Sequence, residues 1–330
     1  MIKLSQECLK ILKDSKNLLA FSHGTDSTAL FYLLCEHGVE FDLAMVDYNL
    51  RAQSKDEVAS AMALAREYGK EIYTRSVLLE DGNFESKARQ VRYEFFAKIC
   101  VEHIYKNVIL AHQLDDKFEW FLMQLGRGAG LNELLGMSEC EQREQFCLVR
   151  PLLKVSKAEI LKYLQNSKIK HFLDASNSDE KYARNFMRAN FSEAFLAKFG
   201  TGVAKSFELL DADKRRLEPK VAHLGDMVYI VQNDQNAMRG VDRVAKMLGV
   251  LLSGAQRAEC ERCMLAKTDC VLAGRVAVGY SDDMLVITPF LKAKMDKAFK
   301  EQCRKGKIPP INRGYLYKKG DLSQFFVFRK

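Results

Sequence analysis

The amino-acid sequence predicts an α/β fold: a doubly wound parallel sheet with a helical extension, followed by a smaller α+β domain. Short apolar runs alternate with amphipathic stretches throughout residues 1–115, which is the pattern of successive strand–helix units. Residues 156–217 carry mainly helical periodicity. A chain of 330 residues is also long enough for two domains, each with a substantial hydrophobic core.

The strand and helix candidates follow one another in strict alternation. Strands are predicted at Leu18–Phe21, Phe41–Val46, Glu71–Val77 and Asn107–Ala111. Helices are predicted at Ser27–Glu36, Lys55–Tyr68, Glu85–Val101 and Leu114–Leu125. A fifth strand at Phe146–Val149 should end before Pro151. Because ligands of such sheets bind at the carboxyl ends of the strands, the loops at those ends are the candidate site.

The remaining chain divides into two further parts. We expect the sheet domain in residues 1–155, its helical extension in 156–217 and a C-terminal domain in 218–330, with a linker at Arg215–Pro219. Within the last part a helix is predicted near Val241–Leu251. Strands are predicted at Val271–Tyr280 and Met284–Thr288.

The composition is that of a globular protein of the cytoplasm, with 48% hydrophobic and 28% charged residues. An apolar run long enough to span a membrane is absent from the sequence, as is an apolar segment of the secretory type near Met1. The nine cysteines are scattered through apolar patterns, which favours reduced thiols over a disulfide framework. Cys260 and Cys263 form a C-x-x-C pair, for which helix packing is favoured over a zinc or iron–sulfur site.

The net charge of +8 is concentrated at the C-terminal end. Residues 291–330 contain twelve Lys or Arg and three Asp or Glu. Such a basic tail on a near-neutral body is typical of a protein that binds a polyanion such as RNA. A solvated charged surface is the alternative.

The most informative segment is the turn between the first strand and the first helix of the sheet. It consists of Ser22, His23, Gly24, Thr25, Asp26 and Ser27. Backbone N–H groups at the start of a helix, with hydroxyl groups beside them, form an anion site, and an aspartate there can orient a metal or a water. The spacing is neither that of a Walker A loop nor that of a dinucleotide-binding loop. An ordinary capped turn is the alternative.

A second cluster of polar residues follows the strand predicted at Asn107–Ala111. His112, Asp115 and Asp116 precede a helix there. Carboxylates at this edge of the sheet could hold Mg²⁺ between ATP oxygens, because magnesium favours a few carboxylates together with substrate phosphates. An acidic helix cap is the alternative.

Several further polar residues are candidates for contacts with a nucleotide or a substrate. Helical spacing puts Arg89 near Arg92 and Arg184 near Arg188, so that each pair could contact phosphate. The other candidates are Arg51, Arg127 and Asp174 in loops, and Asn185 on the helix of Arg184 and Arg188. The alternative is a solvated position for the arginine pairs and Arg51, a helix C-cap run for Arg127, and a local turn for Asp174.

In this order the segments resemble the tRNA(Ile)-lysidine synthetases, which belong to the PP-loop ATP pyrophosphatases. The resemblance runs from the S-H-G-T-D-S loop through A-H-Q-L-D-D, R-G-A-G-L and F-L-D-A-S-N to Y-A-R-N-F-M-R, over roughly residues 15–200. His23 stands where the family pattern has glycine. Tyr48 and Asn49 stand where it has histidine and glycine.

This resemblance implies an enzyme that ligates free L-lysine to C2 of the wobble cytidine of tRNA(Ile) with a CAU anticodon. ATP would lie on Ser22–Ser27, and the activated tRNA would be an adenylate. Asp26 and Asp116 would hold Mg²⁺ or the lysine amine, and Arg184 and Arg188 would contact the adenylate or tRNA phosphates. The basic C-terminal domain would bind the tRNA, and a homodimer is a further expectation.

Two other functions fit the same segments. A tRNA thiolase would share the ATP-activating fold, but the C-x-x-C pair lies far from the nucleotide loop in the sequence. The second is a non-catalytic RNA-binding protein with a degenerate nucleotide loop, and His23 in place of glycine would indicate that degeneration.

Overall fold

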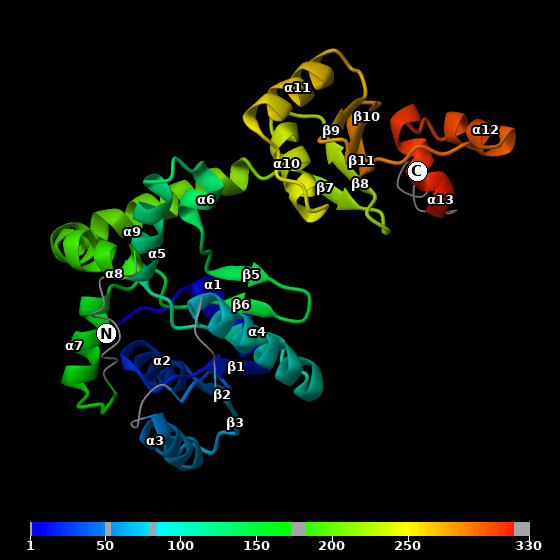
Figure 1. Ribbon diagram of the computed structural model, residues 1–330. Coiled ribbons are helices and arrows are strands. Elements are labelled where there is room, and N and C mark those ends of the chain that lie inside the picture. Colours follow the sequence, from blue (N-terminus) through cyan, green and yellow to red (C-terminus); the bar gives the residue numbers. More distant parts are fainter. Residues whose placement is uncertain (1, 50–53, 79–83, 173–182, 320–330) are drawn as a thin grey trace. The chain divides into compact units, whose positions relative to one another are not determined.

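The computed structural model describes residues 2–49, 54–78, 84–172 and 183–319 (Figure 1). The chain forms two compact units, Met1–Ala212 and Asp213–Lys330, and each is described by itself. Within the described ranges, we find no helix whose length and apolar character would let it cross a bilayer.

The first unit contains a six-stranded sheet in the order β3-β2-β1-β4-β6-β5. Its strands are β1 (Asn17–Ala20), β2 (Asp42–Asp47), β3 (Ile72–Ser76), β4 (Asn107–Ile109), β5 (Cys140–Gln142) and β6 (Cys147–Val149). All neighbours are parallel except β5, which runs antiparallel to β6 at the edge. The predicted doubly wound parallel sheet is therefore confirmed. Strand β5 was not predicted, because Cys140–Gln142 has no apolar alternation.

Some helices of the first unit cover the two faces of this sheet, and others pack on one another. Their bounds are α1 (Gln6–Lys13), α2 (Thr25–Glu36), α3 (Ser54–Glu67), α4 (Phe84–His103), α5 (Leu114–Leu125), α6 (Leu131–Leu135), α7 (Lys157–Asn166), α8 (Ala183–Met187), the π-helical turn η2 (Arg188–Ser192) and α9 (Glu193–Arg216). Helices α1, α2, α3 and α7 share one apolar cluster, and α4 packs into a second one. Because β1 connects to β2 on one side and pairs with β4 on the other, the strand order reverses beside β1. Sheets of this type bind their ligands at that point.

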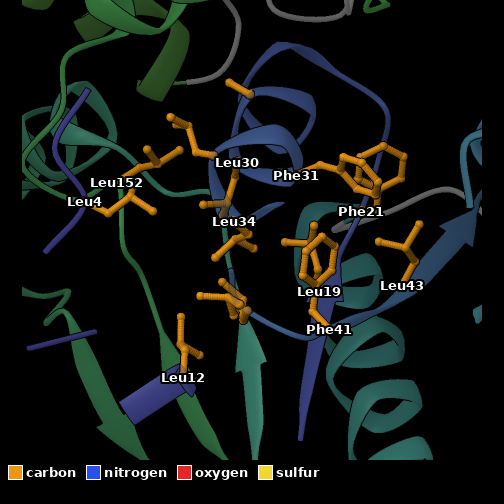
Figure 2. Close-up of a cluster of buried hydrophobic side chains, with 14 of the residues drawn as sticks. Leu4, Leu12, Leu19, Phe21, Leu30, Phe31, Leu34, Phe41, Leu43 and Leu152 are labelled. Atoms are coloured by element: carbon orange, nitrogen blue, oxygen red, sulfur yellow. The ribbon is translucent and has the colours of Figure 1, made fainter. Parts of the chain in front are cut away.

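Phe31 of α2 lies at the centre of the larger cluster (Figure 2). It is fully buried, and its ring lies 5.8 Å from that of Phe21 and 5.3 Å from that of Phe41, between ring centres. Removal of such a side chain typically costs about 3–5 kcal/mol. The packing of Phe31 therefore anchors α2, whose first turn contains Thr25, Asp26 and Ser27 of the loop.

The helices that begin near the carboxyl edge of the sheet start in different ways. Helix α5 begins with a capping box between Gln113 and Asp116, and α7 with one between Ser156 and Glu159. Helix α2 has Gly24 at its N-cap and no side-chain hydrogen bond there. The backbone N–H groups in the first turn of α2 are therefore the ones available to bind a ligand.

The second unit contains an antiparallel sheet in the order β7-β8-β11-β10-β9. Its elements are β7 (Val221–His223), β8 (Tyr229–Gln232), α10 (Ala237–Met247), α11 (Gly254–Leu265), β9 (Cys270–Leu272), β10 (Val276–Ser281), β11 (Met284–Pro289), α12 (Lys297–Lys305), η3 (Pro310–Asn312) and α13 (Arg313–Lys319). Helices α10 and α11 pack into one cluster of this unit, whereas α12 and α13 pack into another.

The single strand predicted at Val271–Tyr280 is wrong, because the structure has two strands there. Ala273 and Gly274 adopt φ angles of +50° and +65° between them. These left-handed conformations turn the chain back on itself, so that β9 and β10 pair antiparallel. Apolar residues flank Gly274 and Arg275 closely on both sides, so the sequence pattern was interpreted as one strand.

Candidate active site

A cavity of about 1000 Å³ lies at the carboxyl edge of the first sheet. Its walls come from the segments after β1, β2 and β4 and from helices of the first unit. The sequence-predicted residues that line it are Ser22, Gly24, Thr25, Asp26, Ser27, Arg89, Arg92, His112, Asp115, Asp116, Arg184 and Arg188. Predicted residues that are far apart in the sequence, from Ser22 to Arg188, therefore line the same cavity.

The loop Ser22–Ser27 is held by its own hydroxyl groups. The Oγ atoms of Ser22 and Ser27 lie 3.1 Å apart, and Ser27 Oγ donates to the Gly24 carbonyl at 3.2 Å. The Ser22 N–H donates to Ser27 Oγ at 3.3 Å. These contacts curl the loop over the first turn of α2, which is a ready site for phosphate oxygens.

His23 lies behind the loop and does not line the cavity. Its side chain is buried, with Nδ1 3.3 Å from Thr28 Oγ1 and Nε2 3.0 Å from Ser60 Oγ of α3. Its φ of +58° is in the left-handed region, which favours glycine, the residue of the family pattern at this position. Burial lowers the pKa of His23 below its usual value. A neutral imidazole therefore tethers the loop to α3.

Asp26 extends into the cavity and pairs with Lys157 of α7, with Nζ 2.7 Å from Oδ1. Burial raises the pKa of Asp26, although the lysine partly opposes that effect, and the nearby charge of Asp116 adds to it. The backbone N–H of Lys157 donates to Asp115 Oδ2 at 2.9 Å. Burial likewise raises the pKa of Asp115. Lys157 was not predicted, because its capping-box context indicates only the start of a helix.

A buried cluster of opposite charges forms the wall between α5, α8 and η2. Glu119 has no exposed surface and accepts from Arg184 Nε at 2.8 Å and from Arg188 Nε at 2.7 Å. Asp116 pairs with Arg184 and also accepts the Gln113 N–H at 3.0 Å. Glu119 was missed in the sequence, although it stands one helical turn after Asp116 and so lies on the same face.

His112 is oriented by a buried arginine. Arg150, which is 1% exposed, donates from Nε to His112 Nδ1 at 3.2 Å and from Nη2 to Glu141 at 3.0 Å. Because arginine can only donate, Nδ1 accepts and the ring proton is on Nε2. Burial, followed by the charge of Arg150, lowers the pKa of His112 to about 3. His112 is therefore a neutral hydrogen-bond donor at the cavity wall.

The other predicted residues lie elsewhere. Arg127 is exposed after α5, and neither Arg127 nor Asn185 lines the cavity. Arg51 and Asp174 are outside the described residues. The cavity also has lining residues that the sequence did not single out for it, notably Phe172, whose N–H donates to the His23 carbonyl at 3.1 Å.

Comparison with known proteins agrees with this geometry. Residues 2–194 match the PP-loop domain. The chain is 46% identical to tRNA(Ile)-lysidine synthase of Campylobacter jejuni (strain RM1221), over 96% of this chain and 97% of the relative. It is 38% identical to the Helicobacter pylori (strain ATCC 700392 / 26695) enzyme of that name, over 94% and 91% of the two chains.

The chain belongs to the tRNA(Ile)-lysidine synthase family. As a lysidine synthase it is a ligase, and its PP-loop domain identifies the nucleotide substrate as ATP. The family and the enzyme class inferred from the sequence are therefore confirmed.

The solved structure of a protein with a different name has the same fold. U34-tRNA thiolase NcsA from Methanococcus maripaludis superposes with a TM-score of 0.52 at 19% identity, over 63% of this chain and 75% of that one. This likeness concerns the fold alone. The C-x-x-C of the lysidine synthase lies in α11 of the second unit, where Cys260 is buried in the apolar cluster beside Met264.

Proposed function

We propose that this lysidine synthase joins free L-lysine to C2 of the wobble cytidine in tRNA(Ile) with a CAU anticodon. The family membership supports the reaction. The observation that carries the mechanism is that one cavity combines the phosphate loop with the acidic and basic groups of α5, α7, α8 and η2. These are the groups needed to bind ATP and to accept an amine beside it.

In the first step the cytidine O2 attacks the α-phosphorus of ATP. The new O–P bond forms as the bond to the β-phosphate oxygen breaks, and pyrophosphate leaves. The N–H groups of Thr25 to Ser27 and the hydroxyl of Ser22 would hold the phosphates, with Arg184 and Arg188 toward the adenylate. Positioning and charge neutralisation are the main demands of such a transfer.

In the second step the lysine ε-nitrogen attacks C2, the C2–O bond breaks and AMP leaves. The ammonium group must first lose a proton to become a nucleophile. Asp26 fits this requirement, because its raised pKa makes it a better proton acceptor than an exposed aspartate. Asp116, whose oxygens accept hydrogen bonds from Arg184 and Gln113, would add negative charge near the amine. His112 Nε2 would donate to a carbonyl or phosphate oxygen.

The residues at the loop also fit a magnesium ion. Mg²⁺ accepts one or two carboxylates together with phosphate oxygens. Asp26 suits this best during the first step, before it is needed as a proton acceptor, since both oxygens of Asp116 already accept hydrogen bonds from Arg184 and Gln113. When bound there, the ion would supply charge neutralisation on the phosphates.

The test is transfer of labelled lysine. The purified chain is incubated with ATP, labelled L-lysine and unmodified tRNA(Ile) bearing CAU, and label in the tRNA is counted. The same tRNA with uridine at the wobble position is the matched control. Label in the CAU tRNA alone supports the proposal. No label, with a related enzyme active in parallel, would overturn it.

The proposal extends to the cytoplasmic location and homodimeric assembly that the sequence led us to expect. Sedimentation of the purified chain would test the assembly. The basic residues of the second unit, such as Lys297 and Lys300 on α12, are proposed to contact the tRNA backbone, with salt-dependent affinity as the check.

A further inference from the structure

Four phenylalanine side chains are exposed on the helices that follow residue 183. Phe186, Phe191, Phe195 and Phe199 each expose 42–50% of their surface. We call these four residues the phenylalanine face. Soluble domains rarely leave several large aromatic side chains exposed together unless the surface has a partner.

The π-helical turn η2 aligns the face. In a regular α-helix two residues five positions apart point about 140° away from each other. Phe186 and Phe191 are five apart, yet their ring centres lie 5.9 Å from one another, because η2 widens the turn between them. Phe195 and Phe199 continue the face at helical spacing, with ring centres 5.0 Å apart. Such π-helical turns occur frequently at functional sites.

The helices that carry the phenylalanine face also carry residues that line the active-site cavity. Arg184, Arg188, Glu193, Leu196 and Ala197 line the cavity and stand on the same helices as the phenylalanines. The four phenylalanines therefore alternate along the chain with residues that line the cavity.

The charge beside the face suits a nucleic acid. Arg184 and Arg188 pair with Glu119 and Asp116, so the other basic residues of the range 183–205 are Lys198 and Lys205, with Glu193 as its one acidic residue. Lys198 Nζ lies 5.4 Å from the ring centre of Phe199. Aromatic rings beside basic side chains are the usual surface for unpaired bases, since each base stacks on a ring while its phosphate meets a cation.

We propose that the phenylalanine face is a stacking surface for the unpaired anticodon-loop bases that flank the reacting cytidine. The inference rests on the proposed function, in which that cytidine enters the cavity. A base that leaves the loop stack removes the stacking partner of its neighbours. Rings on the helices that line the cavity replace that partner and hold the flanking bases outside.

The first test measures RNA affinity in the full chain. The probe is a synthetic anticodon stem-loop RNA with a CAU loop. Phe191→Ala and Phe199→Ala should each bind it roughly 5- to 100-fold more weakly, as expected for the loss of one stacked base. Phe199→Tyr should retain the affinity, and ATP affinity should not change. Leu209→Ala is the matched control, because Leu209 is exposed on the same helix outside the face.

A second test reports stacking directly. Phe199→Trp adds an indole at the face, whereas the wild-type chain has a single tryptophan, Trp120. The stem-loop should quench the fluorescence of this variant well beyond the change seen in the wild type. If the face binds a partner other than RNA, the stem-loop should change the fluorescence of the variant no more than that of the wild type.

Three results are decisive. Unchanged RNA affinity in both alanine variants would overturn the inference, even if lysine transfer proceeds. A shift of the alanine variants to a smaller species in sedimentation would assign the face to a contact between two copies and also overturn it. Loss of stem-loop affinity in the variants, with no lysine transfer by the wild type, would support the stacking surface and reject only the proposed function.

Discussion

Replacement of His23 tests whether the phosphate loop carries backbone strain that its side chain compensates. His23 has a φ of +58° and hydrogen bonds to Thr28 and Ser60. His23→Gly removes both the strain and the tether. His23→Ala removes the tether and keeps the strain. The difference between these two variants therefore isolates the backbone contribution.

The magnitudes follow from the contacts. The two hydrogen bonds contribute about 1 kcal/mol each. The ring contacts with Phe21 and Phe172, both at 5.1 Å between centres, add about 0.5–1.5 kcal/mol each. His23→Ala should thus lose about 3–5 kcal/mol of unfolding free energy. A left-handed conformation costs an alanine about 1–2 kcal/mol, and the extra freedom of unfolded glycine offsets about 0.4–1 kcal/mol of that. His23→Gly should therefore lose roughly 1 kcal/mol less than His23→Ala.

Urea unfolding followed by tryptophan fluorescence measures this difference. The only tryptophan of the chain, Trp120, lies in α5, so the signal reports on the first unit. Ser60→Ala is the control, since it removes one hydrogen bond and should cost about 1 kcal/mol. If His23→Ala proved as stable as His23→Gly, or more stable, the strain argument would be refuted.

Three more predictions concern the cavity. Asp26→Asn should lower the rate of lysine transfer at least about 100-fold. Its affinity for the stem-loop RNA should stay within about twofold of the wild type. A fully active variant would reject Asp26 as the proton acceptor. Glu119→Gln should lower the free energy of urea unfolding by about 3 kcal/mol, because two arginines lose their buried carboxylate. The control Glu144→Gln, at an exposed position, should lower it by less than about 0.5 kcal/mol. Equal losses in the two variants would contradict this prediction. The folded-state pKa of His112, about 3, lies below its usual 6.5, so unfolded chains bind more protons between these values. The contribution of neutral His112 to the unfolding free energy is complete above pH 6.5 and is lost as the pH falls. The unfolding free energy of His112→Gln should therefore decline less steeply than that of the wild type as the pH is lowered. An unchanged slope would count against a neutral His112.

The sequence alone was sufficient for the parallel sheet, its first four strands, the Ser22–Ser27 turn between the first strand and the next helix, and the family. These features depend on neighbours in the chain: alternation of apolar runs sets the βα units, and Ser22–Ser27 stand together in one turn. The same reasoning placed His112 and Asp116 at the correct edge, because parallel strands bring their carboxyl ends together.

Only the tertiary structure showed how the side chains of the site are paired. Lys157 meets Asp26 across 131 residues, and Arg184 meets Glu119 across 65. Local periodicity contains no information on such partners, since they depend on how the helices pack. The left-handed backbone of His23 and the π-helical turn at Arg188–Ser192 are likewise outside the reach of residue patterns. Both are unfavourable for an isolated segment and are held by contacts with distant elements, so the folded chain alone determines them.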